Sequence, residues 1–141
     1  FDDSARYDPG TGHAGKGSLK LSADFVMSRK GKVQTSRYMR LTHGVQSITF
    51  QIRSEDANGL DCKLIDATGQ SHLHHLRFPA DGKWHTIRMK ELAGAETWQG
   101  AGDGKFYMPA RRMFLMLKAD HVVDGRRADL WIDELTITLE E

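Results

Sequence analysis

The segment Ser47–Arg53 reads SITFQIR and alternates strictly between polar and apolar side chains. Strict alternation predicts a β-strand with one buried and one solvent-exposed face, because successive side chains of a strand point to opposite sides. The segment Ser18–Phe25 reads SLKLSADF and places its apolar side chains on one face in the same way. Both patterns predict strands of antiparallel sheets that are buried on one side only.

Further strands are predicted on both sides of these two segments. Leu60–Asp66 and Ser71–Phe78 flank the turn 67–70, whose glycine favours a hairpin. Arg112–Lys118 contains five apolar residues in succession, and its length favours a strand buried on both faces over a short helix. The remaining predicted strands are Lys83–Met89 and Ala128–Leu139.

The pattern as a whole predicts the fold class. No segment shows a helical stripe with a cap and a stop signal. About seven to nine short strands, separated by turn signals, are typical of an all-β protein. We therefore expect an antiparallel two-sheet β-sandwich of the jelly-roll type.

Length and composition bound the possible functions. The 141 residues predict a single β-sandwich domain, residues 1–141, and because the first residue is Phe1 we expect it to be excised from a larger multidomain protein. The formal net charge is +1, which argues against nucleic acid or an anionic membrane as a partner. No apolar run reaches the roughly 18 residues of a membrane span. The single Cys62 is expected to be a small core residue.

Two histidines of the predicted hairpin suggest metal chemistry. His72 and His74 are two apart on a strand, so both point to one face, where they would bind a metal or line a ligand site. Metal-binding jelly rolls of the cupin type complete such a pair with a glutamate, whereas Arg77 and Phe78 follow here. A His-based metal-dependent enzyme that adds His85 stays open as an alternative. No catalytic residue is predicted, because neither a G-x-S-x-G motif nor a facing pair of carboxylates is recognisable.

Aromatic side chains in a polar, glycine-rich segment point to a sugar ligand. The segment 93–108 is predicted to be a long loop and contains Trp98 and Tyr107. The apolar C–H faces of sugar rings stack on such side chains, while sugar hydroxyls need polar partners. The predicted ligand-binding residues are Trp98, Tyr107, His72, His74, Arg37, Tyr38 and Arg88.

Acidic residues near the two ends of the chain form a second candidate site. Asp2 and Asp3 lie near the start, and Asp133 and Glu134 lie in the last predicted strand. First and last strands are often neighbours in sandwiches. These carboxylates and a carbonyl of the glycine-rich loop 8–17 would then form an all-oxygen site, which suits a structural calcium ion.

Four stretches in this order resemble a known family. They are Phe1–Asp3, Gly15–Leu21, Phe78–Ile87 and Leu130–Leu135. The chain resembles the galactose-binding-like jelly-roll carbohydrate-binding modules of bacterial polysaccharide-degrading enzymes. The resemblance implies a structural calcium ion bound by Asp2, Asp133 and a backbone carbonyl near Lys16. It also implies a sugar site on the concave sheet or on the loops at one end.

We therefore expect a non-catalytic carbohydrate-binding module. Its partners would be an oligo- or polysaccharide and an attached catalytic domain, a glycoside hydrolase or polysaccharide lyase, which the module targets to its glycan. The resemblance implies a secreted, periplasmic or cell-surface location. One alternative is a structural sandwich that only packs against a catalytic domain, and the other is the His-based enzyme described above.

Overall fold

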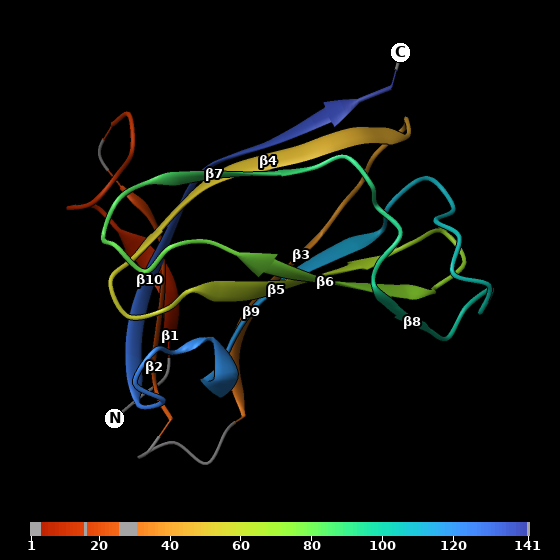
Figure 1. Ribbon diagram of the computed structural model, residues 1–141. Coiled ribbons are helices and arrows are strands. Elements are labelled where there is room, and N and C mark those ends of the chain that lie inside the picture. Colours follow the sequence, from red (N-terminus) through yellow and green to blue (C-terminus); the bar gives the residue numbers. More distant parts are fainter. Residues whose placement is uncertain (1–3, 16, 26–30, 141) are drawn as a thin grey trace.

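The structure is a computed structural model that describes residues 4–15, 17–25 and 31–140. The predicted all-β class is confirmed: within these residues the chain forms ten strands and one short 3₁₀ turn, Ala119–His121, with no α-helix. Figure 1 shows the strands in two stacked layers. The strands are β1 (Ser4–Asp8), β2 (Ser18–Asp24), β3 (Lys32–Tyr38), β4 (Val45–Ser54), β5 (Gly59–Ile65), β6 (Ser71–Arg77), β7 (His85–Met89), β8 (Glu96–Trp98), β9 (Arg112–Lys118) and β10 (Arg127–Leu139).

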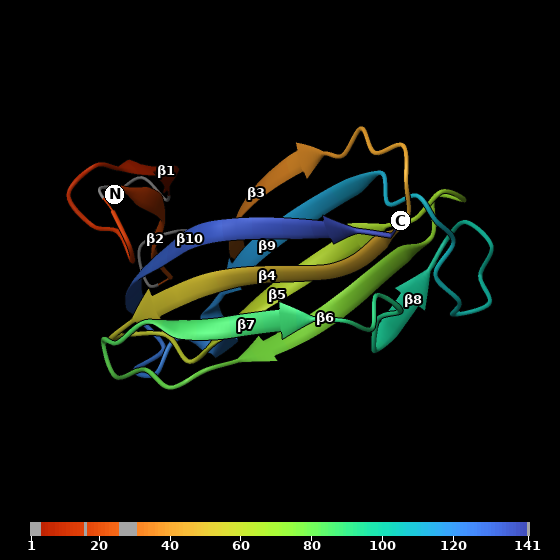
Figure 2. The same ribbon diagram turned by 90° about the horizontal axis from the view of Figure 1, so that it is seen from above.

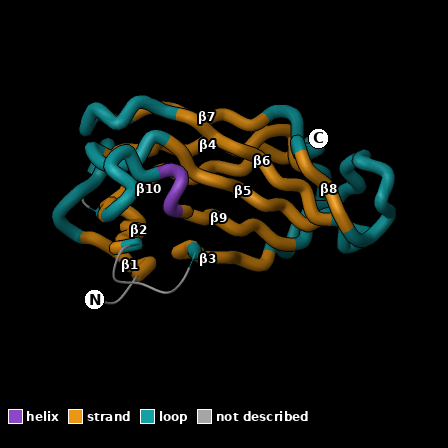
Figure 3. The backbone as a smooth tube through the Cα atoms, turned by 60° about the horizontal axis from the view of Figure 1, so that its bottom comes forward, coloured by secondary structure: helices purple, strands orange, loops and turns teal. Residues whose placement is uncertain are grey.

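Each layer is a five-stranded sheet in the described part of the chain. The first sheet has the order β1-β2-β10-β4-β7, and the second has the order β3-β9-β5-β6-β8. The strand pairs are antiparallel. Figures 2 and 3 show that the second sheet lies across the first as a separate layer, with β8 at its edge. The predicted antiparallel two-sheet β-sandwich is therefore confirmed.

The core lies where the inner faces of the two sheets meet. The alternation in β4 has its expected effect, since Ile48, Phe50 and Ile52 have an exposed fraction of 0%. Cys62 and Leu64 of β5 are also fully buried and join the same cluster from the second sheet. Burial raises the pKa of the Cys62 thiol to about 12, so this side chain serves packing and not nucleophilic chemistry.

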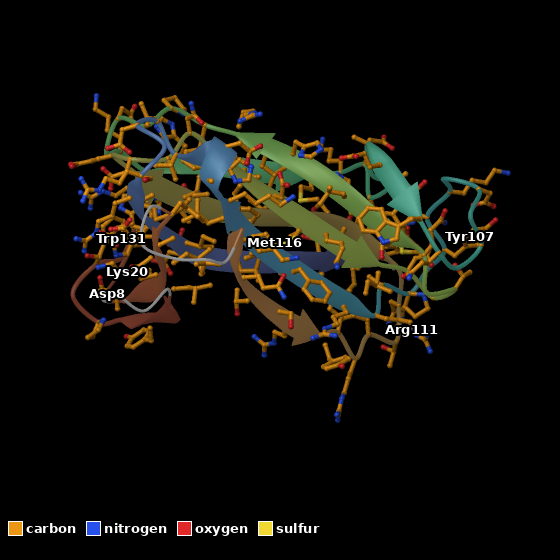
Figure 4. All side chains as sticks on the ribbon, turned by 90° about the horizontal axis from the view of Figure 1, so that it is seen from below. Asp8, Lys20, Tyr107, Arg111, Met116 and Trp131 are labelled. Atoms are coloured by element: carbon orange, nitrogen blue, oxygen red, sulfur yellow. The ribbon has the colours of Figure 1, made fainter. Side chains whose placement is uncertain are left out.

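The strand β9 is buried on both faces, as its unbroken apolar run predicts. Met113, Leu115 and Leu117 point into the main core. Phe114 and Met116 point the other way and form a separate small cluster with Leu73 on the outer face of the second sheet. Figure 4 shows Met116 in the middle of that face. On this outer face, the small apolar cluster therefore lies beneath the polar side chains.

Three strands were not predicted from the sequence: β1, β3 and β8. The strand β3 reads KVQTSRY, and only Val33 of it is buried. It lies at the edge of the second sheet and pairs with β9 alone, so backbone hydrogen bonds rather than apolar alternation define it. The strand β8 has only three residues and interrupts the segment 93–108 that was predicted to be a loop. Among the described residues, no helix has the length and apolar character needed to cross a bilayer.

Candidate functional site

Two of the predicted sugar-binding residues, Tyr38 and Trp98, lie on the outer face of the second sheet. Their exposed fractions are 69% and 40%. The register places them in one row that crosses the five strands, since residues opposite each other in an antiparallel pair share a face. The row runs Tyr38, Arg112, Ile65, Ser71 and Trp98.

A second row lies beside the first on the same face. It runs Ser36, Phe114, Lys63, Leu73 and Glu96. Neighbouring strands are about 4.8 Å apart, so each row is roughly 19 Å long, which exceeds the width of one sugar ring. We call the surface formed by these two rows and by the adjoining row of Gln34, Met116, Asp61 and His75 the Trp98 face.

Cations and aromatic rings alternate across the Trp98 face. The Cζ atom of Arg112 is 4.5 Å from the ring centroid of Tyr38 and 4.4 Å from that of Phe114. The Nζ atom of Lys63 is 4.1 Å from the Phe114 centroid and 5.9 Å from the Trp98 centroid. Such cation–π contacts hold long side chains in place and leave their charges at the surface. Sequence reasoning missed Arg112, Lys63 and Phe114 as site residues, because the apolar run around Phe114 indicated only a buried strand.

A buried carboxylate organises one side of the Trp98 face. Asp61 has an exposed fraction of 1% and accepts hydrogen bonds from Lys118 Nζ at 2.6 Å, His75 Nδ1 at 2.8 Å and His121 Nε2 at 3.1 Å. Burial by itself would raise the pKa of Asp61, but the donors from Lys118 and His75 outweigh it and keep the pKa below its ordinary value. His75 also contacts Glu96 at 2.7 Å, and these two acidic partners raise the pKa of His75.

The segment that carries Trp98 and Tyr107 is fastened to the buried Asp66. The Asp66 carboxylate accepts Tyr107 N–H at 3.3 Å and His72 Nε2–H at 3.0 Å. The backbone of Gly94 in turn donates to His72 Nδ1 at 3.1 Å. His72 has an exposed fraction of 0%, so it holds this segment from inside and is not part of a surface sugar site.

Tyr107 lies beyond β8, at one end of the molecule (Figure 4). Its ring is 38% exposed, and its hydroxyl donates to Asp103. This hydrogen bond raises the pKa of Tyr107 and lowers that of Asp103. Tyr107 is thus held at the tip of a structured loop, close in sequence to β8 but outside the three rows of the Trp98 face.

The other predicted ligand residues lie elsewhere. Arg37 is opposite Met113, on the inner side of β3, and lines a cavity of about 430 Å³ between the sheet edges. His74 and Arg88 come together at the opposite edge of the sandwich, where they line a hollow of about 410 Å³. His74 also contacts the Leu92 carbonyl at 2.8 Å, and burial lowers its pKa. The structure therefore spreads the predicted residues over several surfaces.

Trp131 covers the outer face of the first sheet, at the end away from Tyr107 (Figure 4). Its Nε1–H donates to Asp8 Oδ2 at 2.8 Å. Lys20 Nζ and Arg53 Cζ lie 5.1 and 5.7 Å from its ring centroid. The Trp131 ring is half-buried and its N–H is already bonded, whereas Trp98 and Tyr38 are exposed, so Trp131 offers less free ring surface to a sugar.

The histidines of the alternative enzyme do not converge. His72 bonds to Asp66, His74 bonds to the Leu92 carbonyl, and His85 on the first sheet bonds to Asp81 at 2.8 Å. In the described ranges, His, Cys, Asp and Glu side chains form no group of three that is arranged to hold a metal. The geometry gives no support to the His-based metal-dependent enzyme.

Of the calcium ligands that the family resemblance implies, Asp2 and Lys16 lie outside the described residues. Asp133 lies against the glycine-rich loop, where its carboxylate accepts the backbone N–H groups of His13 and Glu134, each at 2.8 Å. Asp133 also lines the cavity of about 430 Å³ that Arg37 borders. The Ser18 hydroxyl lines this cavity too, and it is buried with no hydrogen-bond partner among the described residues. The Asp133 carboxylate and the Ser18 hydroxyl both line this cavity, and oxygen atoms of these two kinds are ligands that a hard cation prefers.

The fold defines a class: a jelly-roll β-sandwich of the type found in carbohydrate-binding modules. The structure is similar to the module TmCBM61 in complex with β-1,4-galactotriose, with a TM-score of 0.58 and 13% identity over 91% of this chain and 74% of that one. It is also similar to the family 11 carbohydrate-binding module of the cellulosomal cellulase Lic26A-Cel5E of Clostridium thermocellum, with a TM-score of 0.64 and 12% identity over 99% and 82%.

An exo-β-agarase is a third similar structure, with a TM-score of 0.64 and 15% identity over 100% of this chain but only 22% of that chain. No family model matches the sequence, and no curated protein matches it. The likeness to these modules therefore rests on the fold, and the resemblance expected from the sequence is confirmed at that level.

Proposed function

We propose that the chain is a non-catalytic carbohydrate-binding module whose glycan lies across the Trp98 face. The observation that carries this proposal is the row with exposed Tyr38 and Trp98 at its two ends, on one face of a single sheet. The likeness to a module that binds β-1,4-galactotriose and to a cellulase module supports it. An extended chain of sugars would fit a row of this length better than a single sugar would.

The side chains of the Trp98 face have distinct tasks in this proposal. The indole of Trp98 and the ring of Tyr38 offer apolar surfaces for the C–H faces of sugar rings. Lys63 and Arg112, which are fixed by their ring contacts, donate hydrogen bonds to sugar oxygens. The side chains are ordered before the ligand arrives, which lowers the entropic cost of binding. The face is open, so we expect weak to moderate affinity.

We further propose that the module targets an attached polysaccharide-degrading enzyme to its glycan, as part of a secreted, periplasmic or cell-surface protein. Binding to the glycan would raise the effective concentration of substrate near the catalytic domain. The alignment with 22% of an exo-β-agarase supports this arrangement, because a domain of this fold there forms part of a longer chain.

A structural calcium ion completes the proposal. Asp133 would hold it together with Asp2 and a backbone carbonyl near Lys16, and the ion would tie the glycine-rich loop to β10. We expect the melting temperature to fall when EDTA is added and to recover with calcium but not with magnesium. An unchanged melting temperature in EDTA would refute the calcium site and leave the sugar site untouched.

Titration calorimetry with purified glycans tests the sugar site. We expect the 141-residue chain to bind at least one member of a panel that contains β-1,4-galactan, β-glucan, agarose, polygalacturonate and carrageenan. Trp98→Ala and Tyr38→Ala should each weaken binding about tenfold, since stacking on an aromatic ring contributes roughly 1–1.5 kcal/mol.

Tyr7→Ala is the matched control, because Tyr7 is an exposed aromatic side chain on β1 of the other sheet. This variant should bind the glycan as the unmodified chain does. Absence of binding to every glycan, or equal affinity of the Trp98 and Tyr38 variants and the unmodified chain, would overturn the proposed site.

A further inference from the structure

The Trp98 face and its margin carry more positive than negative charge. The register places Lys32 opposite Lys118, two residues along β9 from Met116. Arg77 lies opposite Gly59, two residues along β6 from His75, so the basic side chains Lys32, Lys118 and Arg77 extend the face at this margin. Two carboxylates, Asp61 and Glu96, are the acidic groups that the register of the described strands places on it. The basic side chains are Lys32, Lys63, Arg77, Arg112 and Lys118.

Both carboxylates are already engaged within the protein. Asp61 is held by Lys118, His75 and His121, and Glu96 is held by His75. No salt bridge within the described part of the chain reaches Lys63 or Arg112, which occupy the centre of the face. The centre therefore presents two cations with aromatic rings, and not carboxylates, as their neighbours.

The excess of positive charge on this face affects the pKa of Lys63. Partial burial lowers the pKa of its ammonium group, and the nearby cations Lys32, Arg112 and Lys118 lower it further. Each of these effects disfavours a positive charge at this position. An anion placed beside Lys63 would relieve this repulsion, whereas a neutral group would leave it in place.

Arg112 is preorganised as an anion-binding group. Its guanidinium lies against the Tyr38 and Phe114 rings, and its Nη2 donates to Ser36 Oγ at 2.8 Å. Its Nε is buried and has no hydrogen-bond partner among the described residues. A guanidinium fixed in this way keeps its positive charge at the face, and a charged carboxylate or sulfate oxygen accepts its remaining N–H groups more strongly than a neutral sugar hydroxyl does.

We propose that the glycan bound by the Trp98 face is an acidic polysaccharide, whose carboxylate or sulfate groups lie on Lys63 and Arg112 while its sugar rings stack on Trp98 and Tyr38. This inference rests on the proposed sugar-binding function and names the class of glycan. It also explains why a chain with a net charge of only +1 concentrates cations on one sheet face.

The test compares acidic and neutral glycans on the same protein. Polygalacturonate and alginate provide carboxylates, carrageenan provides sulfates, and β-1,4-galactan, β-glucan and agarose serve as neutral ligands. Affinity is measured by titration calorimetry at low salt and at about 1 M salt, where the Debye length falls to about 3 Å. We expect acidic glycans to bind more tightly than neutral ones, and salt to weaken the acidic complexes selectively.

A charge variant and a matched control locate the effect. Lys63→Met keeps most of the length of the side chain and removes its charge and its N–H donors, and it should weaken acidic binding about tenfold and neutral binding by a clearly smaller factor. Lys83→Met makes the same substitution at an exposed lysine in the turn before β7 and should change nothing. Whether uronate or sulfate polymers bind identifies which anion the face accepts.

Three outcomes would overturn the inference. Binding of a neutral glycan that is equally tight, independent of salt and lost in Trp98→Ala would refute the acidic preference and preserve the proposed function. Equal binding of a single-stranded DNA oligonucleotide would show a general polyanion surface. Absence of binding to any glycan would refute both the inference and the proposed function.

Discussion

Replacing Asp66 by asparagine tests whether one buried carboxylate holds the Trp98 end of the molecule together. Its Oδ1 accepts Thr68 N–H at 2.9 Å, Thr68 Oγ1–H at 2.6 Å and Gln70 N–H at 3.1 Å. Its Oδ2 accepts Gln70 Nε2–H at 3.2 Å, His72 Nε2–H at 3.0 Å and Tyr107 N–H at 3.3 Å. Asp66→Asn keeps the shape of the side chain but turns one of the two acceptors into a donor.

The geometry gives the size of the effect. If the amide keeps its oxygen toward Thr68, its NH₂ group faces the three donors that bonded to Oδ2. His72 cannot adapt by moving its proton, because its Nδ1 already accepts the Gly94 N–H. An orphaned buried donor costs about 1–3 kcal/mol, and a hydrogen bond to a charged acceptor is worth roughly 1.5–3 kcal/mol, so the loss around Oδ2 adds up over its donors. We expect the free energy of unfolding to fall by about 3–5 kcal/mol.

Urea unfolding followed by tryptophan fluorescence measures this loss. Asp120→Asn is the control, because Asp120 is exposed in the 3₁₀ turn, and it should change stability by no more than about 0.5 kcal/mol. A loss below about 1 kcal/mol for Asp66→Asn, or an equal loss in the control, would show that the carboxylate does not organise this end.

The Asp66 carboxylate should also make the free energy of unfolding depend on pH. Burial opposes ionisation of Asp66, but its donors outweigh burial and place its pKa far below the ordinary value of 3.8. The pKa of Asp66 is lower in the folded state than in the unfolded chain. The ionised carboxylate therefore contributes its full stabilisation above the unfolded-state pKa of 3.8, and this stabilisation is lost as the pH falls toward the folded-state pKa. The unmodified chain should therefore lose more stability than Asp66→Asn does when the pH falls below 3.8.

Three further outcomes are expected. Phe50→Ala removes a ring with 0% exposure from the centre of the core and should cost about 3–5 kcal/mol in urea unfolding, so a loss below about 1 kcal/mol would contradict the core assignment. Gly100→Ala places a Cβ 2.1 Å from the backbone nitrogen of Gln70 at a φ of +52°, whereas Gly102→Ala at +66° meets nothing closer than 4.0 Å. The first variant should therefore be the less stable of the two, and equal melting temperatures would refute the close approach. In an NMR titration, the His75 ring should titrate above its ordinary pKa of 6.5, since its two carboxylate partners favour the protonated form, and titration below 6.5 would disprove these contacts.

The sequence predicted the layers of this protein well, because burial in a two-sheet sandwich has a period of two. The alternation of β2 and β4 and the apolar run of β9 identified core strands without any tertiary information. The strands that were missed carry little such alternation. The edge strand β3 and the three-residue β8 are defined by backbone hydrogen bonds to their neighbours.

The candidate site was predicted less completely than the fold. Tyr38 and Trp98 were expected to contact sugar, but their position at opposite ends of one row depends on the register of five strands. His72 was expected to face a ligand, and it is buried because it lies opposite Leu64, on the inner face of β6 that meets the other sheet. A sequence shows that a histidine lies on a particular face of a strand, but not whether that face is solvent-exposed or covered.

The sequence by itself thus determined that this chain forms an antiparallel sandwich with a core of alternating apolar residues, since periodicity is a local property of the chain. Only the tertiary structure brought Arg112, Lys63 and their aromatic neighbours together from β3, β5, β8 and β9. Cross-strand neighbours are set by register and strand order, and these depend on which sequence-distant strands pair when the two sheets close over a common core.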